Sequence, residues 1–107
     1  MSALLSKQDA YQQKLKAQLD QIKSEINQRR AEVEEMVADQ RIKAVTRLEE
    51  LEQQLQLAQE TKNNLQSAPE SALNDLKVKS KKAVAKMQKG LKQLAEEFNL
   101  EPVEEKE

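Results

Sequence analysis

Apolar side chains recur every eleven residues through the first half of the chain. They form two rows, which are Leu4, Leu15, Ile26, Val37 and Leu48, and Tyr11, Ile22, Val33, Ala44 and Leu55. Eleven residues at about 100° each make three helical turns plus roughly 20°, so both rows lie on one side of a nearly straight helix. Because neither Gly nor Pro occurs before residue 67, the pattern predicts one amphipathic helix about 90 Å long at 1.5 Å per residue.

A strong break in the helical pattern follows at residues 67–70. Ser67 and Glu70 match the spacing of a capping box, and Pro69 falls in the first turn of a new helix, where its missing N–H costs least. We therefore expect a turn, although a helix that is only kinked at Pro69 has the same apolar phase and stays an alternative. The predicted segments are a long amphipathic helix (1–66), a turn (67–70), a basic amphipathic helix (71–99) and an acidic disordered tail (100–107).

The predicted fold class is all-α, with the long amphipathic helix folding back on the shorter second helix as a helical hairpin or coiled coil. Folded back at the turn, the second helix is long enough at 1.5 Å per residue to cover only about residues 36–61 of the first helix. The apolar side chains beyond that reach are Leu4, Tyr11, Leu15, Leu19, Ile22, Ile26 and Val33. Since an uncovered apolar stripe of this length needs a partner surface, we expect self-association through these residues and a homo-oligomer.

Long polar side chains narrow the apolar stripe in its middle, at residues 27–30 (Asn-Gln-Arg-Arg) and 39–41 (Asp-Gln-Arg). One interpretation is that these long stems lie beside the apolar seam with their polar ends in water. The other is a polar layer within the seam, which fixes the helix register or the number of chains in an oligomer.

The composition excludes most catalytic chemistry. With no Cys and no His, the chain lacks the usual thiol nucleophile, the commonest general base and the soft metal ligands. Carboxylates do occur one helical turn apart, at Glu32 with Glu35 and at Glu49 with Glu52, and we interpret them as solvated surface. Gly90 stands alone, so there is no Gly-rich phosphate loop. We therefore expect no enzyme, no cofactor, no metal and no small-molecule substrate.

The same composition bears on fold and compartment. The chain is 37% apolar and 35% charged, with Tyr11 and Phe98 as its only aromatic rings, which is typical of long helices. The absence of Cys fits a reducing compartment. No segment approaches the roughly 18 consecutive apolar residues of a membrane span. We therefore expect a cytoplasmic protein.

Seven lysines and no acidic residue occur between positions 77 and 92; the lysines are Lys77, Lys79, Lys81, Lys82, Lys86, Lys89 and Lys92. On a helical wheel they lie opposite an apolar side formed by Leu76, Val84, Met87 and Leu91, so this segment is a basic amphipathic helix. Such a helix can contact an anionic membrane surface or an acidic partner helix. Alternatively, the lysines are the solvated rim of a hairpin. Nucleic acid is not expected, because the chain has almost no rings to stack on bases.

A set of residues spread over positions 9–98 resembles a known family. These residues are Asp9, Ala10, Tyr11, Lys14, 17–20 (Ala-Gln-Leu-Asp), 48–51 (Leu-Glu-Glu-Leu), Ala68, Ala72, 75–77 (Asp-Leu-Lys), Ala83 and Phe98. With them the chain resembles a family of small bacterial coiled-coil proteins that are often described as stress-response proteins. Family members often carry Trp where this chain has Ile22 and Leu73. The resemblance implies a long helical hairpin, a bacterial cytoplasmic setting and no catalytic residues.

Three functional hypotheses follow from these patterns. The leading one is a non-enzymatic, self-associating coiled-coil protein with a stress-related protective or scaffolding role. The first alternative is a peripheral binder of an anionic membrane or an apolar granule surface, which uses the seven lysines. The second is an adaptor or holdase that offers its unpaired apolar stripe to client helices.

Overall fold

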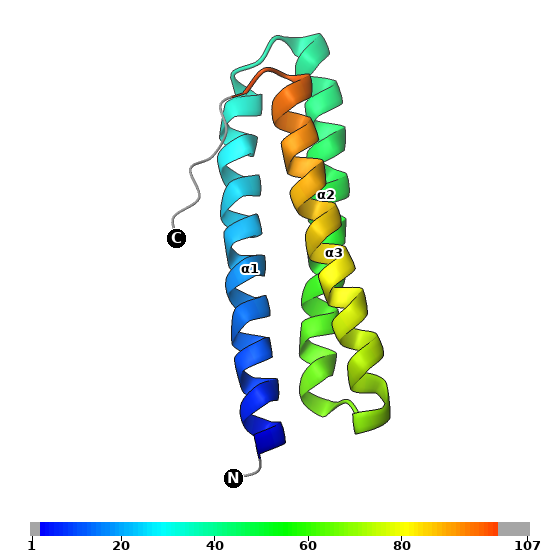
Figure 1. Ribbon diagram of the computed structural model, residues 1–107. Helices are drawn as coiled ribbons and strands as arrows, with labels where there is room; N and C mark the ends of the chain where they lie inside the picture. The colour runs from blue at the N-terminus through cyan, green and yellow to red at the C-terminus, as the bar shows by residue number, and fades with distance from the viewer. Residues whose placement is uncertain (1–2, 101–107) are drawn as a thin grey trace.

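The chain forms a bundle of three helices, α1 (Ala3–Glu34), α2 (Ala38–Ser67) and α3 (Glu70–Glu97). The computed structural model describes the backbone of residues 3–100 and the side chains of residues 10–100. As Figure 1 shows, α2 runs antiparallel to α1, and α3 then returns beside both helices. The bundle measures 55 × 25 × 16 Å. The all-α prediction is confirmed for the described residues, among which there is no strand.

The single long helix predicted over residues 1–66 is wrong. The chain turns at residues 35–37, where Val37 is extended (φ −63°, ψ 153°) and precedes α2 without a side-chain cap from any described residue. No Gly or Pro marks this turn. The apolar phase also continues across it, because Val33 and Ala44 are both buried and lie eleven residues apart. The hydrophobic pattern therefore gave no indication that the chain reverses here.

The buried positions of the three helices follow steps of four and three residues, with one position skipped between Ala58 and Leu65 and one between Leu73 and Ser80, which is a seven-residue repeat. In α1 these positions are Leu15, Leu19, Ile22, Ile26, Arg29 and Val33; in α2 Ala44, Leu48, Leu51, Leu55, Ala58 and Leu65; and in α3 Leu73, Ser80, Val84, Met87, Leu91 and Leu94. Steps of seven and four add to eleven, so a seven-residue repeat also places apolar residues eleven apart. The eleven-residue rows are thus a consequence of the seven-residue repeat with which the three short helices pack.

The turn predicted near Pro69 is present, and the kinked-helix alternative is wrong. Ala68 and Pro69 connect α2 to α3, which lie side by side. The predicted capping box does not form, because Ser67 is the last residue of α2 and no described side chain caps α3. At its other end, α3 stops at Glu97 rather than at residue 99, and Asn99 adopts a positive φ of 56°. Of the predicted tail, 100–107, only Leu100 lies within the described residues.

Gly90 of α3 lies directly against Leu51 of α2. A Cβ atom at this position would meet the Leu51 Cδ2 atom at 2.8 Å, which is below ordinary van der Waals contact. Glycine in a helix interior costs about 1 kcal/mol relative to alanine. Here it leaves room for a core leucine of the neighbouring helix.

The polar interruption of the stripe is split between the core and the surface. Arg29 occupies a core position and is only 1% exposed, and its guanidinium donates to Glu32 at 2.9 Å. The Arg29 Nε atom finds no acceptor among the residues that the structure describes. Arg30 is exposed and forms an ion pair with Glu52 on α2. Arg29 therefore forms a polar layer inside the core, whereas Arg30 lies at the solvent-exposed edge between α1 and α2.

Replacing Arg29 by Met should stabilise the bundle. A buried charge pays a desolvation penalty that one ion pair does not fully offset, and a flexible apolar side chain of similar volume avoids it. We expect the free energy of unfolding in urea to rise by about 1–3 kcal/mol. Arg30→Met is the matched control and should change it by less than about 1 kcal/mol, because the Arg30–Glu52 pair is on the surface. A loss of stability in Arg29→Met would mean that Arg29 holds the core together.

Candidate anionic-surface site on α3

The apolar residues predicted to mediate self-association are mostly buried within a single chain. Five of them, Leu15, Leu19, Ile22, Ile26 and Val33, lie in the bundle core. Tyr11 is half-buried and packs against that core, and Leu4 lies outside the described side chains. The reasoning that these residues need a second copy is therefore wrong, because the unpredicted turn at residues 35–37 brings α2 and α3 over them. For the same reason, this stripe is not free to receive client helices.

The lysine surface is defined here as the seven predicted lysines, Lys77, Lys79, Lys81, Lys82, Lys86, Lys89 and Lys92. All of them belong to α3, and all are exposed except Lys77, which is half-buried. The opposite side of α3 packs into the bundle: Val84, Met87 and Leu91 are buried, and Leu76 is half-buried. The predicted amphipathic division of this helix is confirmed, with its apolar side occupied by the core.

The positive charge of the lysine surface is not neutralised by the rest of the described chain. The ion pairs of the bundle join Arg29 to Glu32, Arg30 to Glu52 and Arg47 to Glu97. None of the seven lysines forms an ion pair with a carboxylate among the described residues. Between the lysines, Val78 is 44% exposed and Ala85 is exposed as well. The surface thus combines uncompensated ammonium groups with small apolar side chains.

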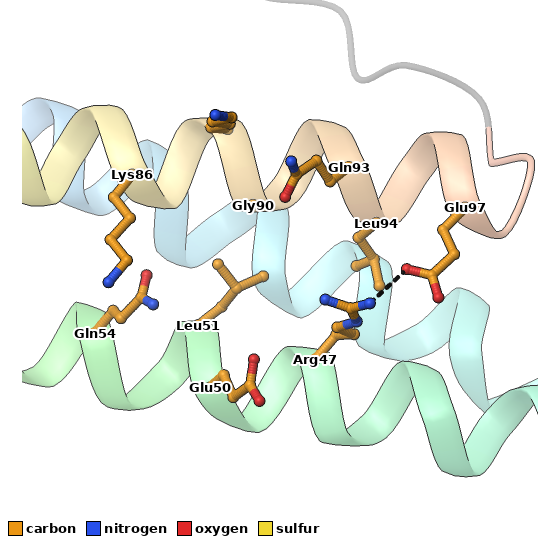
Figure 2. Close-up of a pocket in the computed structure, with 10 residues that line it drawn as sticks. Arg47, Glu50, Leu51, Gln54, Lys86, Gly90, Gln93, Leu94 and Glu97 are labelled. Carbon is orange, nitrogen blue, oxygen red and sulfur yellow. Dashed lines mark ion pairs between the residues drawn. The ribbon is translucent and has the colours of Figure 1, made fainter.

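A hollow of about 340 Å³ between α2 and α3 extends this surface sideways (Figure 2). Lys86 and Lys89 line it together with Arg47 from α2, and the Arg47 guanidinium lies 3.2 Å from the Glu97 carboxylate at one end. Lys86 points across the hollow toward Gln54. The lining combines three basic side chains with two carboxylates, Glu50 and Glu97, and it has no hydroxyl, thiol or imidazole, so its net charge is only weakly positive. The predicted fold-back placed residues 36–61, and with them Arg47 and Gln54, beside the second helix, but no sequence pattern singled out these two side chains.

Tyr11 connects α1 to the start of the lysine surface. Its hydroxyl donates a hydrogen bond to the backbone carbonyl of Lys77 at 3.1 Å, and the Lys77 ammonium lies 5.2 Å from the centroid of the ring. Burial raises the pKa of Tyr11, and an interaction with the Ser80 hydroxyl partly offsets that rise. The Ser80 hydroxyl itself donates to the Leu76 carbonyl at 2.8 Å. Sequence reasoning assigned Tyr11 to self-association because residues 66 positions apart give no sign of their contact.

Among the described residues, no group of three or more acidic side chains could hold a metal ion, and no helix is long and apolar enough to cross a membrane. No protein-family model, curated protein or solved structure matches the chain. The likeness to stress-response coiled-coil proteins therefore stays a prediction.

Tyr11 should titrate with a pKa above the ordinary value of about 10. Because the folded-state pKa is raised, the stability contributed by protonated Tyr11 is fully present below the unfolded pKa. It is lost as the pH rises through the folded pKa. The chain has one Tyr and no Trp, so phenolate absorbance reports this group alone. We expect a midpoint above 10 in the folded protein and near 10 in urea; equal midpoints would mean that the ring is not buried against α3.

Proposed function

We propose that this protein is a peripheral binder of anionic phospholipid surfaces, which it contacts through the lysine surface of α3. The observation that carries the proposal is a set of seven lysines, six of them exposed, with no ion-pair partner among the described residues. Residues 77–92 extend over about 24 Å of α3 at 1.5 Å per residue. The lysines cover the outward half of this helix, and their long, flexible side chains can reach a planar layer of anionic headgroups.

The expected strength is that of a reversible contact. Each lysine close to an anionic membrane contributes on the order of 1 kcal/mol, and the attraction falls off within a Debye length of about 10 Å at 0.1 M salt. Six exposed lysines therefore support binding at low ionic strength and release at high ionic strength. Val78 and Ala85 lie among the lysines and can enter the headgroup region only to a shallow depth, because both side chains are small.

The bundle stays closed in this proposal. The lysine surface already faces outward, while Val84, Met87 and Leu91 stay in the core. An insertion that used those apolar residues would have to detach α3 from α1 and α2. Electrostatic contact has no such cost, so we propose that the helix content is the same in the free and bound protein.

A lipid surface is favoured over the other polyanions by the chemistry of α3. Sequence-tolerant binding of single-stranded nucleic acid depends on exposed rings, and Tyr11, the ring nearest to the lysines, is half-buried. The anionic lipids of a cell are concentrated in the cytoplasmic leaflet. The proposal therefore places the protein in the cytoplasm, in agreement with a chain that contains no Cys.

A protective or scaffolding role through self-association is a second candidate function. It no longer rests on the apolar residues of α1, which are covered within one chain. The observation that favours it is the turn at residues 35–37, which has no helix-breaking residue to hold it.

Flotation with phospholipid vesicles tests the proposed function. Wild-type protein should float with vesicles that contain 30% phosphatidylglycerol (about 50 mM salt), and should be released by about 0.5 M salt or by pure phosphatidylcholine. Lys81, Lys82, Lys86 and Lys89 changed together to Gln should lower the bound fraction at least tenfold, since four contacts of about 1 kcal/mol are removed.

The matched control changes four exposed lysines on the other helices, Lys14, Lys16, Lys23 and Lys43, to Gln. It has the same net charge as the α3 variant and should keep most of the binding. Equal loss in both variants would mean that only total charge matters. Absence of wild-type binding would contradict the proposal, and preferential binding to an acidic polypeptide at the same salt would replace the lipid by a protein partner.

A further inference from the structure

In both turns of the bundle, the residue that precedes the second helix has nearly the same backbone conformation, but the residue type differs. Val37 precedes α2 with φ −63° and ψ 153°, and Pro69 precedes α3 with φ −66° and ψ 155°. Proline at this position excludes a continuous helix, because it lacks the N–H and its ring clashes with the preceding turn. Valine at the equivalent position is compatible with both a turn and a continuous helix. The α2–α3 turn is therefore locked in the folded-back form, whereas the α1–α2 turn is not.

Joining α1 and α2 into one helix also keeps their apolar sides aligned. Val33 and Ala44 are the buried residues on either side of the turn, and eleven residues make three helical turns plus roughly 20°. A straightened turn adds helical hydrogen bonds at the N–H groups that begin α2, where no described side chain acts as a cap. The segment that links the helices thus has a helical alternative, which is the long helix expected from the pattern alone.

We propose that the α1–α2 turn is an exchange hinge through which two copies of this chain form a domain-swapped dimer. In the dimer, α1 and α2 form one continuous helix, and each α1 packs on α2 and α3 of the other copy. The core contacts of the monomer are kept, because the same surfaces meet between chains instead of within one. Short connections between packed elements favour such exchange, since both forms bury the same residues.

The register of the bundle fixes which residues meet at the centre of the dimer. Arg30 pairs with Glu52, and Tyr11 and Gln12 share a hollow with Leu65, so residues whose numbers sum to about 76–82 lie opposite each other in α1 and α2. Extended through the straightened turn, this register centres the dimer on residues 38–41. Val37 is 67% exposed in the monomer. In the continuous helix it lies four residues after Val33 and seven before Ala44, which is a core position of the seven-residue repeat, so the dimer covers it.

This arrangement gives a substitution that acts on one form only. Val37→Pro fits the monomer, because φ is already −63° and the Val37 N–H donates no backbone hydrogen bond there; it cannot fit a continuous helix. Val37→Ala is compatible with both forms.

The first experiment measures mass by sedimentation velocity after refolding at about 0.5 mM protein. We expect a dimer fraction in the wild type and in Val37→Ala, and no dimer in Val37→Pro with unchanged helical circular dichroism. Absence of dimer in both the wild type and Val37→Ala would overturn the proposal. A dimer fraction in Val37→Pro equal to that of the wild type would do the same.

The second experiment separates exchange from side-by-side association. Cysteines introduced at Lys23 and Gln56, both exposed, carry spin labels at unique positions because the chain has no native Cys. Mixing with excess unlabelled protein before refolding leaves only distances within one chain. The monomer gives a short distance of about 20 Å across adjacent helices, whereas the exchanged dimer gives about 50 Å along one helix at 1.5 Å per residue. A dimer with only the short distance would contradict exchange.

Discussion

One apolar stripe of constant phase, from Tyr11 to Leu65, has to be removed from water, and the rest of the fold depends on how this is done. A straight helix would leave the stripe exposed along its whole length. By reversing at residues 35–37, the chain packs the first half of the stripe against the second, and α3 covers both. Each buried leucine or isoleucine contributes about 1.5–3 kcal/mol relative to an exposed one. The free energy gained by burial therefore exceeds the cost of interrupting the helix, although residues 35–37 have no intrinsic preference to end one.

Closing the core determines which surface is left for function. The core takes the apolar side of every helix, so the lysines of α3 face outward. The arginines lie elsewhere and are used within the bundle, where Arg30 and Arg47 pair across helices with Glu52 and Glu97. These two arginines form surface ion pairs between helices, whereas the lysines of α3 form none with the described carboxylates. Exposed Val37 marks the α1–α2 turn, which we propose as the exchange hinge.

The sequence predicted the all-α class, the turn at Pro69 and the exposed lysines, because each has a local cause: composition, a proline and a one-sided charge pattern. It did not predict the turn at residues 35–37, because the helical phase is the same on both sides of Val37 and only packing against α2 and α3 favours the break. That omission led directly to the expectation that Leu15 and Ile22 need a second chain to cover them, whereas both are buried within one chain. The hollow beside Gly90 and the contact of Tyr11 with Lys77 join distant positions, and no local pattern reveals them.

Small-angle X-ray scattering at low protein concentration tests most directly the claim that the chain covers its own apolar stripe. The closed three-helix bundle has a radius of gyration of 16.0 Å and a long axis of 55 Å, so the scattering of a monomer should extrapolate to values close to these. A monomer with a maximum dimension near the roughly 90 Å of an uninterrupted 60-residue helix would contradict the turn at residues 35–37.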